Sequence, residues 1–268
     1  MGRKKRRGSL LSGVSPMTVA SGVTSSGAAG GSVQGPLWSL YNLQESSGTR
    51  VDQMGNNDMD VLVNNPGRAT GISDDGYALN LDGTQYVKST NDIIDNFSGI
   101  EKLSVNFWFY LNNSPGYGEF WGLGDNESGL EINYNSPGGG ELNFRLSVSG
   151  THHYLKQGNH VLSTETWFMY TAWMDLSQST SADKANVYIN GASKGTWDSG
   201  SLPSVTPTLG EDRMMIGVGK ALAASSIIDG RIDQVSIFKD YVLTADDIAF
   251  LYGSGTPPTS ANIINRFP

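Results

Sequence analysis

Apolar and polar residues alternate along most of the chain from Pro36 onward. The segments with this pattern are LWSLYNL (37–43), YALNLD (77–82), TQYVKS (84–89), LSVNFWFYL (103–111), GLEINYN (129–135), ELNFRLSV (141–148), WFMYTAWMDL (167–176), NVYIN (186–190), RMMIGVG (213–219) and IDQVSIFK (232–239). Alternation with a period of two places successive side chains on opposite faces of a strand. The pattern therefore predicts an all-β protein, a sandwich or jelly roll of short antiparallel strands.

Turn and cap signals support this interpretation. Asn190-Gly191 separates two strand-like runs, and this dipeptide is typical of a two-residue hairpin whose turn positions both need positive φ. One segment, LTADDIAFLYG, predicts a short helix near the C-terminus. Thr244 is a good N-cap residue, Asp247 stands three positions later to complete a capping box, and Gly253 ends the segment.

The first 35 residues have a different composition. Five consecutive positive residues near the start are followed by no charged residue until Glu45; they are Arg3, Lys4, Lys5, Arg6 and Arg7. The stretch SGVTSSGAAGGSVQGP is rich in Gly, Ser and Ala, as flexible linkers are. We therefore predict three parts: an extended arm over 1–35, a β-sandwich over 36–255 and a C-terminal tail over 256–268.

Composition and charge narrow the classes of protein. The 268 residues include 34 Gly, and only 16% of them are charged, which fits a protein of strands and turns. The absence of Cys excludes a disulfide framework and a thiolate metal site. After Arg7 the chain holds the other 13 of its 18 Lys and Arg against all 26 Asp and Glu, a net charge of 13 − 26 = −13. The basic residues are thus confined to one end of an acidic protein.

Five segments, in order, resemble the laminin-G-like branch of the concanavalin A-like jelly rolls. They are LWSLYNLQESSGTRVDQMGNND, GYALNLDGTQYVKST, LSVNFWFYL, the pair TWFMYTAWMD and VYINGASKG, and IDGRIDQVSIFKDYVLTADDIAFLYGSG. The resemblance covers about residues 37–255. It implies two antiparallel sheets packed as a jelly-roll sandwich, with one short C-terminal helix after the last strand.

Some relatives of this fold cleave polysaccharides with carboxylates on alternate residues of one strand, which project to one face. Here the comparable strands carry one carboxylate each, Glu131 and Glu141, and the strand ending in WMDLSQ carries only Asp175. Solvated acids on strand faces are the better interpretation, because a fold does not bring its relatives' activity with it. We therefore predict that the protein is not an enzyme, with a glycoside hydrolase ranked last.

Metal sites are considered for two groups of residues. His152 and His153 are adjacent, so they point to opposite faces of a strand and do not form one site, and His160 stands in the same segment. The resemblance implies a structural Ca²⁺ among loop oxygens. The loop VDQMGNNDMD offers hard oxygen ligands for it, at Asp52, Asn56, Asn57, Asp58 and Asp60. The alternative is that Asp and Asn are simply the residues of turns.

A glycan site needs exposed aromatic and polar side chains. The segment NNSPGYGEFWGLGDN is predicted to be a loop that offers Tyr117, Trp121, Asp125 and Asn126. Phe120 and Trp121 are adjacent, so one of the two is expected to face inward. Trp197, in GTWDSG, is a further aromatic residue in turn-like company.

Three functions are weighed from these observations. The first is a non-enzymatic structural protein of a virion, because arms of this composition before laminin-G-like domains resemble those of tailed-phage capsid-decoration or tail proteins. The arm would contact capsid or tail proteins through its five basic residues, or nucleic acid, and the sandwich would face outward and contact host glycans. A homo-oligomer is a further possible partner state, and no membrane contact is expected, because no apolar run is long enough to span a bilayer. The second is a free-standing bacterial lectin, extracellular or on the cell surface. The third is the glycoside hydrolase.

Overall fold

The computed structural model describes residues 36–73, 76–89, 93, 96–113, 116–125, 127–135, 140–210, 213–220 and 226–268. The predicted arm over 1–35, including its five basic residues, lies outside the described residues, as does Asn126. All structural statements below refer to the unit that begins at Gln34 and ends at Pro268.

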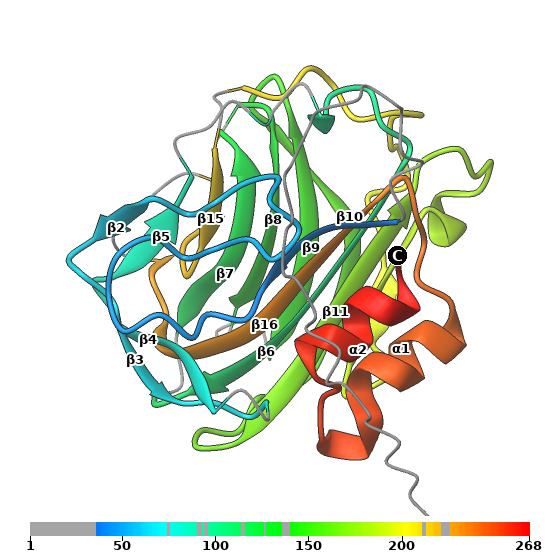
Figure 1. Cartoon of the computed structure of the whole chain (residues 1–268). Helices are drawn as coiled ribbons and strands as arrows, with labels where there is room; N and C mark the ends of the chain where they lie inside the picture. Colours follow the sequence, from blue (N-terminus) through cyan, green and yellow to red (C-terminus); the bar gives the residue numbers. More distant parts are fainter. Residues whose placement is uncertain are drawn as a thin grey trace, which may run out of the picture. The chain divides into compact units, whose positions relative to one another are not determined.

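Two antiparallel sheets form the framework (Figure 1). Sheet 1 has the strand order β13-β12-β11-β6-β16-β4-β3, with β1 also paired to β16. Its strands are β1 (Leu37–Tyr41), β3 (Gly67–Thr70), β4 (Tyr77–Asp82), β6 (Lys102–Leu111), β11 (Trp167–Asp175), β12 (Ala185–Ile189), β13 (Ala192–Ser193) and β16 (Asp229–Lys239). Sheet 2 has the order β14-β10-β9-β8-β7-β15-β5-β2. Its strands are β2 (Val61–Val63), β5 (Tyr86–Lys88), β7 (Tyr117–Gly124), β8 (Gly129–Asn135), β9 (Glu141–Val148), β10 (Thr151–Asn159), β14 (Gly195–Trp197) and β15 (Met214–Ile216).

The predicted fold class is confirmed, with differences in detail. The alternating segments form strands, and β4, β8 and β9 have the predicted bounds. Asn190 and Gly191 form the expected turn with φ of 51° and 76°. The alternation did not predict two kinds of strand. One kind is short: β2, β3, β13 and β14. The other kind is interrupted by a bulge: β7 and β10.

The strand β16 organises sheet 1. It pairs with β6 along its length, and on its other side it pairs first with β4 and then with β1. A bulge between Asp233 and Ser236 separates these two halves. The chain can therefore place two different partners, far apart in sequence, along one side of a single strand.

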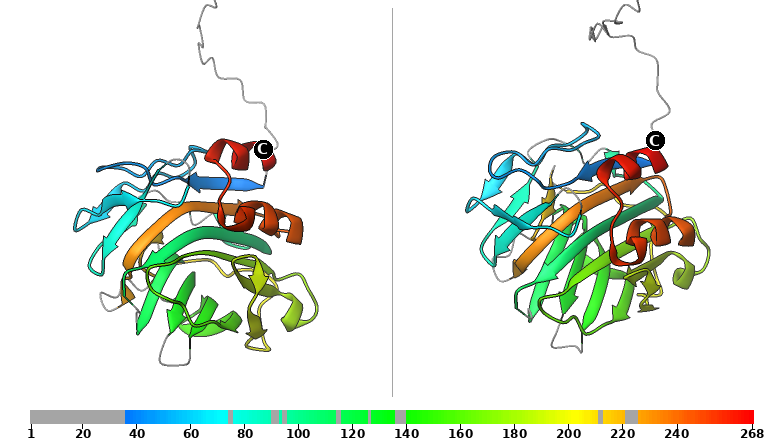
Figure 2. Two further views of the ribbon diagram at one scale, coloured as in Figure 1. Left: turned by 90° about the horizontal axis from the view of Figure 1, so that it is seen from below. Right: turned by 60° about the horizontal axis from the view of Figure 1, so that its bottom comes forward.

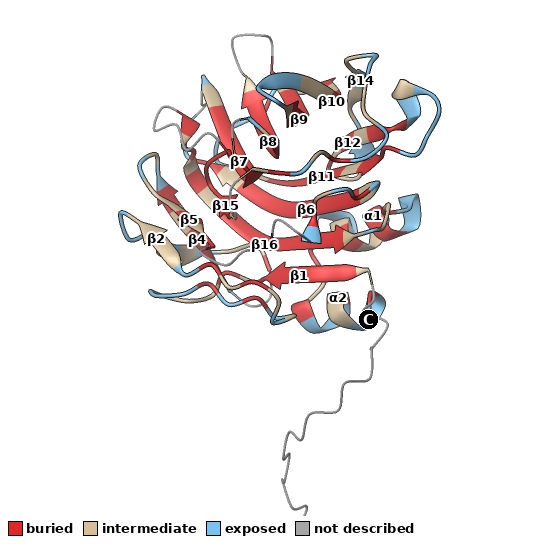
Figure 3. Ribbon diagram, turned by 90° about the horizontal axis from the view of Figure 1, so that it is seen from above, coloured by how far each residue is buried: buried red, intermediate tan, exposed pale blue. Residues whose placement is uncertain are grey.

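The main core lies between the two sheets. Inward-facing aromatic residues of β6 meet those of both sheets, and the rings of Phe109 and Phe120 lie 4.6 Å apart while Phe107 and Tyr170 stack at 5.3 Å. Buried residues follow the strands of both sheets, as Figure 3 shows. This burial is the result that the alternating pattern predicts.

A second core covers the other side of sheet 1. Outward-facing Trp108, Met169 and Phe238 pack with two helices, α1 (Ala245–Tyr252) and α2 (Ser260–Arg266). Figures 1 and 2 show both helices on the side of sheet 1 that faces away from sheet 2. The outer face of sheet 1 is therefore occupied by the protein's own residues in this region.

The first helix is confirmed and the second is a correction. Thr244 and Asp247 form the predicted capping box of α1. The segment expected to be a tail contains α2, which is held by the ion pair between Arg266 and Asp247 at 3.0 Å and by the ring of Phe267 on Phe238. These partners are distant in the sequence, so local patterns did not indicate the helix.

At the bulge in β16, the buried carboxylate of Asp233 binds the loop that follows β3. Asp233 is 0% exposed, and its Oδ2 accepts hydrogen bonds from the backbone N–H groups of Ile72 and Ser73 at 3.0 and 3.2 Å. Gly71 lets this loop approach, because a Cβ there would lie 2.5 Å from Oδ2 of Asp233. Burial raises the pKa of Asp233 to about 6, although these hydrogen bonds act in the opposite direction.

The first prediction concerns this carboxyl group. Its folded pKa of about 6 lies above the ordinary value for an unfolded chain, ~3.9, so its contribution to stability is present below pH ~4 and is lost as the pH rises through 6. We expect the free energy of unfolding to fall between pH 4 and pH 7, on the order of 2 kcal/mol from this group. Urea denaturation at several pH values should show a smaller fall in Asp233→Asn, and equal slopes in the two proteins would contradict the assignment.

Candidate functional site

The two outer faces of the sandwich differ in character. Helices cover the outer face of sheet 1, whereas strand alternation places polar side chains on the outer face of sheet 2. We call this surface the polar face; it consists of Tyr117, Glu119, Glu131, Asn133, Asn135, Glu141, Asn143, Arg145, Ser147, His152, Tyr154, Gln157 and Trp197. Aromatic, amide and charged groups on one sheet face are a combination that binding sites use.

A buried carboxylate lies at the centre of the polar face. Glu131 is 1% exposed, and its Oε2 lies 2.9 Å from Nζ of Lys220. Its Oε1 accepts hydrogen bonds from Arg145, which stands opposite it on β9, and from the amide of Asn133 at 2.6 Å. Two cations thus contact this buried anion, and their charges also act on a second buried carboxylate, that of Glu119. Pairing of this kind is the condition under which a charge can be buried.

The loop after β15 carries Lys220 onto this face. Gly122 makes room for the loop, because a Cβ at that position would lie 2.5 Å from the backbone nitrogen of Lys220. Glu119 accepts hydrogen bonds from the N–H of Gly219 at 2.8 Å and from the hydroxyl of Tyr117 at 3.0 Å. Burial lowers the pKa of Lys220 to about 8 and raises the pKa of Glu119.

Arg145 connects the buried charges to the exposed rim of the face. It donates a hydrogen bond to the hydroxyl of Tyr117 at 2.9 Å, and its guanidinium carbon lies 5.7 Å from the centre of the Tyr154 ring. That ring meets Trp197 edge to face at 5.3 Å. Trp197 is 49% exposed, so its ring is open to a ligand from solvent.

The strand β14 is fixed where it carries Trp197. Trp197 stands opposite Gln157 on β10, and a register shift follows between Gln157 and Gly158. The hydroxyl of Ser199 accepts a hydrogen bond from the backbone N–H of Tyr154 at 2.6 Å, and the N–H of Ser199 donates to the carbonyl of Tyr154 at 3.0 Å. The aromatic pair therefore rests on a hydrogen-bonded frame.

The two glutamates considered from the sequence as a catalytic pair do not lie close together. Glu131 stands opposite Arg145, whereas Glu141 stands opposite Asn135, four residues further along β8. At ~3.4 Å per residue the backbones of the two glutamates are roughly 14 Å apart along the strands. A glycosidase pair needs a separation of about 5 to 9.5 Å, so this pair does not have the required geometry.

The structure separates the predicted glycan residues from one another. The segment predicted to be a loop is mostly the strand β7, and Trp121 is a correction: it is 1% exposed and lies in the main core. A register shift between Glu119 and Trp121 lets both Phe120 and Trp121 pack inward. Tyr117 lies half-buried on the polar face, and Asp125 accepts hydrogen bonds from the N–H groups of a turn.

The loop predicted to bind calcium is organised by hydrogen bonds instead. Oδ1 of Asp52 accepts from the N–H groups of Leu40 and Met54, and Oδ2 accepts from the hydroxyl of Ser39 and from the N–H groups of Asn56 and Asn57. A carboxylate whose two oxygens face five donors does not fit a calcium ligand.

The other expected calcium ligands also make contacts within the protein, mostly through atoms that do not bind calcium. The side-chain amide nitrogen of Asn56 donates to the carbonyl of Trp38, and that of Asn57 donates to the hydroxyl of Tyr41 at 3.2 Å. Asp58 accepts from the N–H of Asp52 at 2.8 Å, and Asp60 also has an interaction partner. These contacts occupy amide nitrogens and one oxygen of Asp58, whereas Oδ1 of Asn57 is buried without a hydrogen-bond partner. The hydrogen bonds of the loop therefore count against Asp52 as a calcium ligand, and the other expected ligands stay a prediction.

The side chains of the three histidines have different surroundings. His152 is on the polar face with Nδ1 2.5 Å from the hydroxyl of Ser147, His153 stands opposite Leu146, and His160 meets the ring of Phe168 edge to face. Among the described residues no three His, Asp or Glu side chains converge as a metal site would require.

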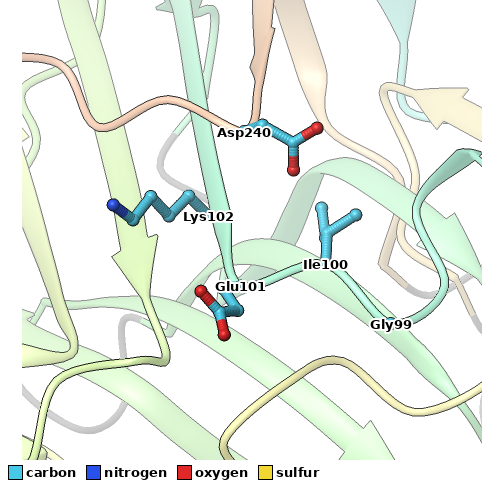
Figure 4. A pocket seen from close by; sticks show the side chains of 5 residues that line it. All are labelled: Gly99, Ile100, Glu101, Lys102 and Asp240. Atoms are coloured by element: carbon cyan, nitrogen blue, oxygen red, sulfur yellow. The ribbon is translucent and has the colours of Figure 1, made fainter.

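A pocket of about 430 Å³ lies at the N-terminal end of β6 (Figure 4). It is lined by Gly99, Ile100, Glu101, Lys102 and Asp240. Its charged side chains point in different directions, and Lys102 is turned toward Asp175, whose carboxylate lies 3.7 Å from its Nζ. This pocket therefore lacks the convergent polar groups of a binding site.

The residues that define the rim were not found from the sequence. In the sequence Trp197 is marked only as an aromatic residue near a turn, and no local pattern marks Tyr154 or Arg145. Their proximity depends on the pairing of β14 with β10 and of β10 with β9. The GTWDSG turn after a hairpin was the one sequence signal available.

The architecture defines a class: a jelly-roll β-sandwich with one face covered by helices and the other open and polar. The family comparison gives the same result from sequence, since residues 81–249 match the Concanavalin A-like lectin/glucanases superfamily in its laminin-G form. The chain belongs to this family. No curated protein sequence matches the chain. None of the helices among the described residues is long and apolar enough to cross a membrane.

Solved structures share the fold at low sequence identity. Domain 4 of a GH43 extracellular arabinanase from Geobacillus stearothermophilus, in complex with arabinotriose, matches with a TM-score of 0.59 and 18% identity over 82% of this chain and 99% of that one. A structure of botulinum neurotoxin type C, whose cell entry depends on two ganglioside molecules, gives 0.56 and 21% over 81% and 50%. A Trypanosoma rangeli sialidase gives 0.56 and 13% over 82% and 33%, so this chain spans half or less of these two proteins.

The second prediction tests the buried charge cluster. Replacing Glu131 by Gln removes the anion that pairs with both Arg145 and Lys220, and the side chain of Lys220 is 0% exposed. We expect the variant to lose about 3 kcal/mol of stability, the usual effect of breaking a buried ion pair. Glu141→Gln, on the same face but half-exposed, is the matched control and should change stability by less than about 1 kcal/mol. Equal losses in urea denaturation would show that the cluster is not the centre of this face.

Proposed function

We propose that the domain is a carbohydrate-binding module whose ligand rests on the rim of the polar face. The exposed ring of Trp197, set against Tyr154, is the observation that carries the proposal. A sugar presents an apolar C–H face that packs on an aromatic ring, and its hydroxyls bond to polar groups beside the ring. Gln157 stands opposite Trp197, and Arg145 stands opposite Tyr154, so polar groups surround the pair.

The relatives support the proposal by their ligands. The arabinanase domain was solved with arabinotriose, and botulinum neurotoxin type C interacts with gangliosides. Tyr117 extends the proposed surface toward β7 through its hydrogen bond with Arg145. The ligand would therefore lie across several strands, as a short chain of sugar residues does.

The third prediction tests this surface. The purified protein should bind members of a glycan array, and Trp197→Ala should lower the affinity at least about tenfold, or ~1.4 kcal/mol, as the ring contact is lost. Tyr77→Ala is the matched control, since Tyr77 is 42% exposed on sheet 1 and also packs against a guanidinium, that of Arg68 at 3.9 Å. Binding that survives the loss of Trp197 but not of Tyr77 would place the ligand on the other sheet.

We propose further that the module belongs to the surface of a virion, anchored by residues 1–35. The sequence supports this: five positive charges stand at positions 3–7, and an uncharged stretch rich in Gly and Ser precedes the sandwich. A basic segment of this composition can bind an acidic partner such as a capsid or tail protein. In this proposal the arm attaches the protein to the particle. The sandwich contacts glycans on the host and has no catalytic role.

The fourth prediction separates the arm from the domain. Deletion of residues 2–35 should abolish incorporation into particles, while the shortened protein melts at the same temperature as the full chain in solution. Calorimetry and quantification in purified particles measure the two effects. Normal incorporation would refute the anchoring role, and early melting or aggregation would show that the arm forms part of the domain's core.

A further inference from the structure

We infer that two copies of this chain associate through the part of the outer face of sheet 1 that lies beyond the second core, as an isologous pair related by a two-fold axis. The inference does not depend on carbohydrate binding, because it concerns the opposite sheet. It rests on two neighbouring rows of side chains, one rich in hydrogen-bond donors and the other rich in acceptors.

The first row, here called the donor row, crosses four adjacent strands. Arg231 of β16 stands opposite Asn80 of β4 on one side and opposite Tyr110 of β6 on the other, and Trp167 of β11 stands opposite Tyr110. The row faces outward, because the residues that alternate with it, such as Phe109, lie in the main core. All four side chains are half-buried, so the row can be reached from solvent.

The guanidinium of Arg231 is held in place but has no carboxylate partner. Its carbon lies 4.6 Å from the centre of the Tyr110 ring, and one of its N–H groups donates to the carbonyl of Thr70 at 3.2 Å. No Asp or Glu of the described residues forms an ion pair with it. The ring of Tyr110 also meets that of Trp167 at 5.6 Å. Arg, Tyr and Trp are the residue types that contribute most to binding energy in protein interfaces.

The second row, here called the acceptor row, lies two residue positions away on the same strands. Asp82 of β4 stands opposite Asp229 of β16, and Asn112 follows β6 directly. The Asp229 carboxylate accepts hydrogen bonds from the amides of Asn112 at 2.7 Å and Asn113 at 2.5 Å. Asp82 is exposed, and its Oδ1 accepts from the N–H and hydroxyl groups of Thr84. Both carboxylates can accept further bonds, since two carboxylate oxygens offer about four lone-pair sites.

Two such rows side by side are complementary to a second copy of themselves. A strand rises ~3.4 Å per residue, so the rows are roughly 7 Å apart. A two-fold axis that runs across the strands between the rows places the donor row of each copy over the acceptor row of the other. Arg231 then faces Asp229 of the second copy, and Asn80 faces Asp82. Each of these contacts occurs twice in the pair.

Charge complementarity identifies the second copy as the occupant. A guanidinium without a carboxylate pairs strongly with one, and the adjacent row presents carboxylates at the spacing that the two-fold axis requires. The ends of the domain stay clear of the contact. Leu37 and Phe267 lie at Phe238 of β16, seven residues or roughly 24 Å along the strand from Arg231. The pair is therefore compatible with attachment through either end.

The test measures the oligomeric state of the full chain by sedimentation equilibrium over a range of protein concentrations. We expect the unaltered chain to form a dimer, and Arg231→Asp and Asp229→Arg each to weaken it at least about tenfold, because two pairs of like charges then face each other. An equimolar mixture of the two variants should recover the dimer, since every contact in the mixed pair again joins an Arg to an Asp.

A second exchange leaves Asp229 and its amide contacts intact. Asn80→Asp should weaken the dimer by placing a carboxylate against Asp82 of the other copy, and mixing with Asp82→Arg should recover it. Arg68→Asp is the matched control, because Arg68 also packs on a tyrosine ring, that of Tyr77 at 3.9 Å, but lies outside both rows. It should leave the dimer unchanged, and circular dichroism checks the folding of every variant.

Three results would overturn the inference. They are an unaltered chain that stays monomeric, a dimer that Arg231→Asp and Asn80→Asp leave intact, and a loss of the dimer that neither mixture recovers. None of these results bears on glycan binding through Trp197, which lies on sheet 2.

Discussion

The polar face depends on one constraint. The carboxylate of Glu131 has almost no access to water and is therefore paired with cations inside the protein. Its burial requires both Arg145 from the neighbouring strand and Lys220 from a distant loop. The loop can deliver Lys220 only because Gly122 leaves space beneath its backbone. Three separate parts of the chain are therefore positioned by one charge, and the guanidinium that neutralises it also supports the aromatic rim.

The two sheets use their outer faces in opposite ways. Sheet 1 presents Trp108, Met169 and Phe238 outward and buries them under α1 and α2, which adds apolar area to the fold. Sheet 2 presents polar side chains outward, and the central ones are enclosed by one another while the rim stays open. Arg145 links the two regions, because its guanidinium pairs with Glu131 at the centre and lies 5.7 Å from the centre of the Tyr154 ring at the rim.

The sequence was most informative where structure is local. Strict alternation located the long strands, and the capping residues Thr244 and Asp247 located α1, since both signals arise within a few residues. The helix α2, the inward turn of Trp121 at a bulge and the meeting of Trp197 with Tyr154 all depend on partners that are distant in the chain. Asp52 shows a further limit, since an acidic residue in a loop has the same sequence pattern whether it binds a metal or backbone N–H groups.

The two ends of the described domain meet at one strand. Leu37 of β1 stands opposite Phe238 of β16, and the ring of Phe267, next to the last residue, lies 4.8 Å from that of Phe238. Both ends thus lie at sheet 1, across the sandwich from the polar face. Any support that holds the domain by either end leaves the polar face directed away from it. Copies held side by side on such a support would present parallel faces, the arrangement in which contacts too weak for one copy add up through multivalency.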